Sequence, residues 1–265
     1  MSIHISRLTG SLILFLFTAC TGDTDSRTQG RETTMAENTS SYETPVHRQI
    51  LVVTTADWDA VPGKLRRFEW KNNAWAEAGE PIDVVVGKKG MGWGRGLENY
   101  TQRKGPVKKE GDLKSPAGVF LLGSAFGYAP ETDVDWIKSP YIHVTKATMC
   151  IEDGKSARYN SIVDEGEAEA DWNSTDHMLR KDDLYEWGMF VAHNSPPVAG
   201  GGSCIFLHVA QVNDDGTAGC TAMAKPKMVE VLRWIDAMAQ PILVQVPQDY
   251  YQEFQAMYKL PDTDQ

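Results

Sequence analysis

Short runs of β-branched and aromatic residues, separated by turn signals, constrain the fold of this chain more than any other feature. Residues 65–70 alternate apolar and polar side chains, which is the pattern of a strand with one buried face. Asn72 and Asn73 follow as a turn signal, so a hairpin is predicted there. Further strands are predicted at residues 50–54, 82–86, 115–122, 141–145, 188–192, 204–209 and 243–246.

Helical periodicity is confined to one stretch, residues 226–239. Pro226 suits the first turn of a helix. The apolar residues that recur on one face of this predicted helix are Met228, Val231, Leu232, Ile235 and Met238. Because strands do not alternate with long helices, a doubly wound sheet is disfavoured. The sequence predicts a single, mostly β domain with a few helices.

The first twenty residues predict export. Arg7 provides a short positive region, and Leu12–Phe17 forms an apolar region too short to span a bilayer. The stretch Phe17-Thr18-Ala19-Cys20 resembles the lipobox of bacterial lipoprotein signals, although an aliphatic residue is usual at the position of Phe17.

That resemblance implies a signal peptide over residues 1–20 and a lipid anchor on Cys20. Thr21 follows instead of Asp, which in such lipoproteins suits transport to the outer membrane. A periplasmic protein held to the membrane by its lipid is therefore expected. Simple cleavage and secretion is the alternative.

Residues 21–46 are rich in small polar and acidic residues and predict a flexible linker, because they offer too little apolar surface to bury. The folded domain is expected over residues 47–265. The formal net charge is −10, and the sequence has no lysine-arginine stripe that could neutralise phosphates. Nucleic-acid binding is therefore not expected, and the sequence has no cofactor motif.

Cys220 lies among small residues, in Gly216–Ala222, where backbone amides can turn toward one point and the sulfur can stay accessible. A free thiol titrates near pH 8.5 and is a weak nucleophile until a base activates it. His208, twelve residues earlier, ends the predicted strand at 204–209 and could take the thiol proton.

Two sequence elements resemble the catalytic motifs of L,D-transpeptidases of the YkuD type. One is Ile205-Phe206-Leu207-His208 followed by Thr217-Ala218-Gly219-Cys220. The other is the upstream segment Gly111-Asp112-Leu113-Lys114-Ser115-Pro116-Ala117-Gly118-Val119-Phe120, which resembles the family's Thr/Ser-Pro-x-Gly-x-Phe element. The resemblance covers roughly residues 50 to 240. It implies a β-sandwich-like catalytic domain and an acyl-enzyme on cysteine.

Carried over by position, the resemblance implies that Cys220 is the nucleophile and His208 the general base. Backbone N–H groups near Gly219 and Cys220 would form the oxyanion hole. Ser203 and Thr217 would hold the loop or contact the substrate.

Two positions depart from the family pattern. Val209 lies where the family often has Gly, and Thr221-Ala222-Met223 lie where it often has Arg shortly after the cysteine. Because that Arg is expected to help fix an anionic substrate, its absence leaves the substrate and the acceptor open.

His193 and Asn194 close the predicted strand at 188–192 and have two interpretations. They could line the cleft, where they would bind substrate or orient His208. Alternatively, they are a polar pair that caps a loop at the end of a strand.

Cys150 and Cys204 are the pair left for a disulfide, since Cys220 must stay reduced and Cys20 is taken by lipid. An oxidising compartment permits such a bond. A zinc site of Cys204, His208, His193 and Cys220 is the alternative, although neither C-x-x-C nor H-E-x-x-H is present.

The leading functional hypothesis is an L,D-transpeptidase that acts on peptidoglycan stem peptides. An L,D-carboxypeptidase or hydrolase would use the same cysteine with water as acceptor. A non-catalytic wall-binding lipoprotein is the third hypothesis.

Overall fold

The fold is built around a sheet that closes on itself. A computed structural model of the chain describes residues 45–261 except 167–168 and 212–214. The described residues belong to one compact unit. The predicted signal, Cys20 and all but the last two residues of the predicted linker lie outside the described residues. The main sheet has the strand order β1 (Gln49–Thr55), β14 (Ile242–Pro247), β6 (Ser115–Gly127), β11 (Trp187–Val191), β12 (Phe206–Val209), β13 (Thr221–Met223), β4 (Ile82–Val85), β2 (Pro62–Lys71) and β3 (Ala74–Glu77).

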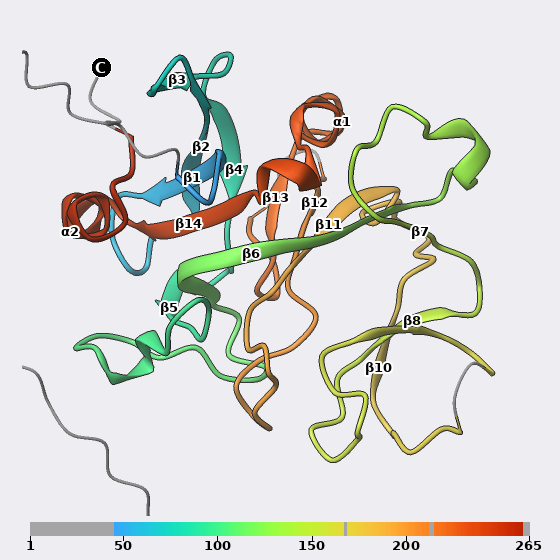
Figure 1. The fold of residues 1–265 in the computed structure, drawn as a ribbon. Helices are drawn as coiled ribbons and strands as arrows, with labels where there is room; N and C mark the ends of the chain where they lie inside the picture. The colour runs from blue at the N-terminus through green and yellow to red at the C-terminus, as the bar shows by residue number, and fades with distance from the viewer. Residues whose placement is uncertain (1–44, 167–168, 212–214, 262–265) are drawn as a thin grey trace, which may run out of the picture. The chain divides into compact units, whose positions relative to one another are not determined.

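Closure comes from β1, which pairs in parallel with β14 and antiparallel with β2. Its residues Ile50, Leu51, Val52 and Val53 are all buried, because the strand lies between these two neighbours in the apolar core. β6 crosses the middle of the view in Figure 1 and also pairs with the short strands β5 (Met91–Trp93) and β7 (Tyr141–His143). The predicted mostly β fold is confirmed, and its main sheet is a closed barrel.

The hairpin predicted at Asn72 and Asn73 is present between β2 and β3. Both residues have positive φ angles, 52° and 60°, which asparagine tolerates better than most residues. The turn therefore follows from local chemistry that the sequence displays.

The helices differ from the prediction. α1 spans Lys225–Trp234 and ends where Ile235 adopts an extended conformation, and a 3-10 turn, η3 (Ala237–Ala239), follows. Met238, expected on the buried face, is 80% exposed as a result. A second helix, α2 (Gln248–Tyr258), was not predicted, and it buries Tyr251 and Phe254 against the core. Neither helix in the described ranges is long and apolar enough to cross a membrane.

A separate three-stranded sheet carries one wall of the candidate site. Its order is β10 (Thr175–His177), β8 (Thr148–Ile151) and β9 (Ile162–Asp164), and β8 and β10 are at the lower right of Figure 1. A disulfide joins Cys150 of β8 to Cys204, two residues before β12, with an S–S distance of 2.07 Å. The pairing expected from the sequence is present, and it fastens the small sheet to the main one.

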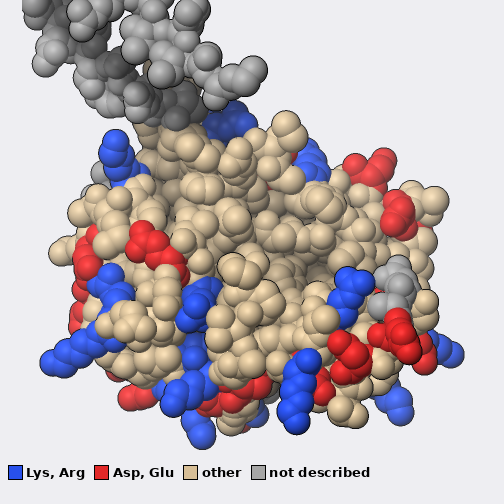
Figure 2. All heavy atoms as spheres, turned by 60° about the horizontal axis from the view of Figure 1, so that its bottom comes forward, with Lys and Arg blue, Asp and Glu red and all other residues tan. Residues whose placement is uncertain are grey.

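Two short 3-10 turns complete the described elements, η1 (Tyr100–Gln102) and η2 (Glu131–Asp133). On the face drawn in Figure 2, Lys and Arg side chains are interspersed with Asp and Glu around a largely uncharged centre. Neither sign of charge forms a continuous patch on that face.

Candidate active site

Cys220 is held beside β12 by the parallel pairing of β12 with β13. That pairing places Leu207 opposite Thr221 and so brings Cys220 next to Phe206. The Phe206 N–H donates to Cys220 Sγ (3.3 Å), and the thiol donates to Cys204 O (3.6 Å). Cys220 is the one free cysteine among the described residues and is 7% exposed.

Cys220 lines a small cavity of about 140 Å³ that several parts of the chain enclose. The small sheet and the residue after β8 contribute Asp176 and Glu152. The loop before β6 contributes Lys108 and Glu110, and Tyr185 and Cys220 complete the wall. His208, His193, Asn194 and Thr217 are not among the residues that line the cavity, whereas Ser203 and Gly219 are.

Hydroxyl groups behind Cys220 fix the loop that carries it. Thr217 Oγ1 donates to Cys220 O (2.6 Å) and accepts the Gly219 N–H (3.0 Å). Ser115 Oγ donates to the same Cys220 carbonyl (2.8 Å). The two motif elements of the sequence therefore meet at Cys220.

This arrangement corrects one expected role. The Gly219 N–H donates within the loop to Thr217 Oγ1, so it is not available as an oxyanion donor in this structure. Of the two roles expected for Thr217, it has the first, since it holds the loop. It does not line the cavity, so a contact with the substrate is not supported.

His208 lies on the same face of β12 as Phe206, but no hydrogen bond joins it to Cys220 Sγ among the interactions of the described residues. Its Nδ1–H donates to Val209 O (2.8 Å), and its ring contacts the Tyr185 ring, with centroids 5.4 Å apart. The physical reason is register. His208 is two residues beyond Phe206, whose N–H meets the sulfur, and two strand residues advance by roughly 7 Å. The direct thiol–imidazole pair expected from the sequence is therefore not formed.

His193 and Asn194 cap a loop, which is the second of their two interpretations, and they are not among the residues that line the cavity, which corrects the interpretation that they bind substrate. His193 is 1% exposed, its Nε2–H donates to Gly201 O (2.9 Å), and its Nδ1 accepts the Arg95 N–H (3.4 Å). The Asn194 amide bonds to the backbone of Val198 and Gly202. Both side chains fix the loop between β11 and β12, because buried polar groups must find partners.

The burial of His193 should make the free energy of unfolding depend on pH. Desolvation, opposed by the hydrogen bond to Gly201, lowers the pKa of His193 to about 4 from the model-peptide value near 6.5. Because the unfolded imidazole binds its proton first as pH falls, the stabilising contribution is complete above pH 6.5 and is lost as pH falls through 4. We expect the free energy of unfolding to fall by about 3 kcal/mol from this group across that range.

Urea unfolding at several pH values between 7 and 4 measures this contribution. A His193→Gln variant, which is neutral at every pH, should be less stable at pH 7 and should lose less stability on acidification. Equal slopes for the two proteins would contradict the assignment.

Carboxylates of the cavity lining accept hydrogen bonds from hydroxyl groups. Tyr185 Oη donates to Asp176 Oδ2 (2.6 Å), and Glu110 Oε2 accepts from Ser203 Oγ (2.8 Å) and Tyr159 Oη (2.5 Å). Burial raises the pKa of Asp176, while Tyr185 and Arg180 oppose the shift. The wall of the cavity is therefore acidic.

Glu152 belongs to the same acidic wall. Burial raises its pKa, and the charges of Asp176 and Glu110 raise it further. The negative charges of Asp176 and Glu110 therefore act on Glu152.

The thiol rests in its protonated form. Burial raises the pKa of Cys220 to about 12, although the Phe206 N–H and the Lys108 charge oppose the shift. A nucleophilic role therefore requires loss of the proton when substrate is bound.

The alternative zinc set is not assembled. The Cys204 sulfur is bonded to Cys150, and both ring nitrogens of His193 contact backbone atoms. Within the described ranges, no group of three or more His, Cys, Asp or Glu side chains is arranged to hold a metal ion.

Sequence reasoning missed Lys108, Glu152, Asp176 and Tyr185. The sequence held one signal for Glu152. Glu152 is two residues from Cys150 and Ser203 is next to Cys204, so the expected disulfide brings Glu152 near Ser203. The others lie in polar segments without a motif, and only the tertiary fold brings them to the cysteine.

No family model matches the chain, and no curated protein matches it either. Solved structures give distant similarities. A mutant of the helical cell shape determining protein Pgp2 from Campylobacter jejuni is 14% identical with a TM-score of 0.37, over 75% of this chain and 47% of that one. Bd1075 of Bdellovibrio bacteriovorus is 12% identical with a TM-score of 0.38, over 80% of this chain and 56% of that one. The chain thus spans about half the length of these neighbours.

Proposed function

We propose that the chain is an acyltransferase of the L,D-transpeptidase kind, with Cys220 as its nucleophile and peptidoglycan stem peptides as substrates. One observation carries the proposal: Cys220 has a free thiol and lines a cavity, whereas the other two described cysteines are bonded to each other. The contact between Ser115 Oγ and Cys220 O supports it, because it joins the two elements that resemble the family motifs.

The proposed reaction has two steps. Cys220 Sγ attacks the carbonyl carbon that precedes the terminal D-alanine of a stem tetrapeptide, an S–C bond forms, and the C–N bond breaks. The proton lost by the thiol ends on the departing amine. In the second step an acceptor amine attacks the thioester, the S–C bond breaks, and a proton of the acceptor returns to the sulfur.

His208 is the proposed carrier of the proton between thiol and amine. It lies on the same face of β12 as Phe206, and its Nδ1–H donates to Val209 O, which fixes the orientation of the ring. We expect His208→Gln to lower turnover by about 10²-fold or more. Because no hydrogen bond joins His208 to Cys220 Sγ at rest, the rate at which iodoacetamide alkylates Cys220 should change little in His208→Gln. A variant with unchanged turnover would remove His208 from the mechanism.

Product analysis tests the proposed function. The purified chain is incubated with disaccharide tetrapeptides, and the products are separated and weighed by mass spectrometry. Crosslinked dimers are expected from a transpeptidase. Tripeptide monomers alone would identify an L,D-carboxypeptidase with the same nucleophile, and no turnover would contradict both enzymes.

A wall-binding protein without catalysis is the second candidate. The observation that favours it is the burial of the thiol, whose pKa is raised to about 12, because a buried neutral thiol is unreactive. In that case the chain would sediment with purified peptidoglycan without turnover, and Cys220→Ala would bind equally well.

We further propose that the chain is exported and lipid-anchored through Cys20, on the periplasmic side of the outer membrane. The lipobox-like stretch that ends at Cys20 supports this location. Labelling with a radioactive fatty acid in a bacterial host should mark the wild type and not Cys20→Ser. Equal labelling of both proteins would contradict the anchor.

A further inference from the structure

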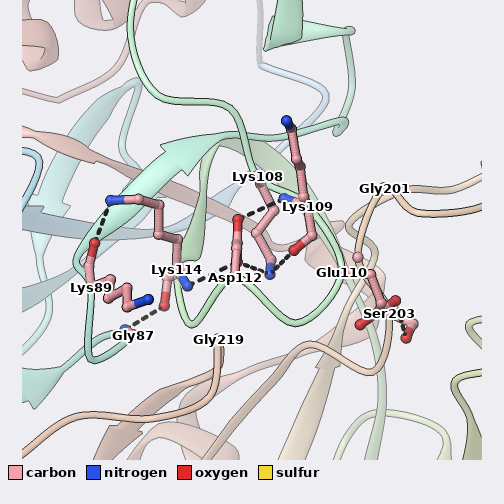
Figure 3. A network of polar contacts seen from close by, with 12 residues as sticks. Gly87, Lys89, Lys108, Lys109, Glu110, Asp112, Lys114, Gly201, Ser203 and Gly219 are labelled. Carbon is pink, nitrogen blue, oxygen red and sulfur yellow. Dashed lines mark hydrogen bonds and ion pairs between the residues drawn. The ribbon is translucent and has the colours of Figure 1, made fainter.

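Lys108 is a buried cation at the candidate site. Its side chain is only 3% exposed, and its Nζ donates to Asp112 Oδ1 (2.6 Å) and Lys109 O (2.7 Å), as Figure 3 shows. Asp112 also accepts the backbone N–H groups of Lys109 and Lys114, so the loop holds the carboxylate in place. The ammonium is therefore fixed.

The fixed ammonium lies close to the loop that carries the nucleophile. A methyl group placed on Gly219 would be 3.6 Å from Lys108 Nζ, and Lys108 lines the same cavity as Cys220. An ammonium has three N–H donors. Within the described part of the chain, two of them meet the oxygen atoms of Asp112 and Lys109.

The site needs such a charge for two reasons. Burial holds Cys220 in its neutral form, and the Gly219 N–H donates to Thr217. An ion pair such as Lys108–Asp112 adds little to stability when it is buried, because its desolvation offsets the Coulomb attraction. A role in chemistry accounts for its position better than a role in folding.

We propose that the Lys108 ammonium stabilises the negative charge that develops at Cys220, first on the thiolate and then on the oxyanion of the tetrahedral intermediate. The inference rests on the proposed function and assigns a residue outside both motif elements. Lys108 places a positive charge near the nucleophile. Thr221-Ala222-Met223, which lie where the family often has Arg, supply no such charge. It acts through its field, because preorganised charge in a dry site stabilises a developing anion strongly.

Other charged groups also act on the sulfur. The titratable side chains at or near the cavity are Glu110, Asp112, Glu152, Asp176, Arg180, Tyr185 and His208. Asp176 raises the pKa of Cys220, whereas Lys108 and Arg180 lower it. Removal of Lys108 should therefore raise the pKa of Cys220 further and lower the fraction of Cys220 present as thiolate.

The test measures the rate at which iodoacetamide alkylates Cys220 in the full chain at pH 8, followed by mass spectrometry of the peptide that contains it. The rate follows the thiolate fraction even far below the pKa. We expect Lys108→Met to react about tenfold more slowly, because a nearby opposite charge shifts a pKa by about one unit or more. Lys108→Arg keeps the charge and should retain the rate within about twofold.

Lys109→Met is the matched control, because it removes the same charge from the neighbouring residue. The Lys109 side chain is exposed and points away from Gly219 in Figure 3, so its loss should leave the rate unchanged. Lys108→Gln provides a second neutral variant that can keep a hydrogen bond to Asp112. Thermal melting and the intact Cys150–Cys204 bond identify the folded variants.

A folded Lys108→Met or Lys108→Gln with the wild-type rate would overturn the inference, as would a wild-type sulfur that does not react at all. Alkylation needs no substrate, so the outcomes can be told apart. A tenfold slower reaction without any muropeptide turnover would contradict the proposed function alone. Turnover by the wild type with an unchanged alkylation rate in the variants would contradict the role of Lys108 alone.

Discussion

Cys220→Ala is expected to lower turnover of stem peptides by on the order of 10⁴-fold or more, because loss of a nucleophile removes the covalent route entirely. The cavity, its acidic wall and Lys108 would remain, so substrate binding should persist. The measurement is the rate of product formation from disaccharide tetrapeptides by wild type and variant at equal concentration.

The fold of the variant must be shown to be intact. Cys220 Sγ accepts one backbone N–H from Phe206 and donates to Cys204 O, so alanine removes only two weak contacts. We expect the melting temperature to change little. Cys220→Ser is the matched control, since it keeps a hydrogen-bonding group of similar size with far weaker nucleophilicity. Turnover within tenfold of wild type by a folded Cys220→Ala would contradict the proposed mechanism.

Loss of the Cys150–Cys204 disulfide is expected to lower the free energy of unfolding by about 4 kcal/mol, on the order predicted for the chain entropy of a loop of this length. The bond closes a sequence separation of 54 residues. It also fastens the three-stranded sheet, so its loss should loosen the wall that carries Glu152 and Asp176. Turnover should therefore decline in variants that still fold.

Urea unfolding of the double variant Cys150→Ala/Cys204→Ala, compared with the wild type, measures the effect. A reductant should shift the unfolding midpoint of the wild type and leave that of the double variant unchanged. Equal stability of the two proteins under oxidising conditions would contradict a structural role for the bond.

Most of the barrel strands could be predicted because they carry an apolar pattern, whereas the three-residue strand β13 was not predicted. Apolar and polar residues alternate over Phe68–Trp70, and the strand predicted at residues 50–54 begins with a continuous apolar run, Ile50–Val53. The small sheet was not predicted, since β10 is Thr-Asp-His and has no apolar pattern. Closure could not be predicted either, because it depends on the pairing of β1 with β14 from the far end of the chain. The prediction that Met238 lies on the buried face of a helix was wrong, because the helix ends at Trp234.

The same division holds for the site. Cys220 and Ser115 lie in motifs, and the structure brings them together. His193 has the sequence context of a site residue, a polar side chain at the end of a strand, and its burial cannot be read from that context. Lys108 lies in a lysine-rich stretch that is typical of an exposed loop. Only the packing of that loop against the Cys220 segment makes it a buried cation.

The central claim is that the sulfur of Cys220 becomes acylated, and mass spectrometry of the trapped enzyme tests it most directly. The chain is mixed with a stem tetrapeptide for seconds, quenched in acid and digested. The proposal predicts that the peptide containing Cys220 gains the mass of the donor without its terminal alanine, and that hydroxylamine removes the adduct. An unmodified Cys220 in a preparation that turns over substrate would contradict it.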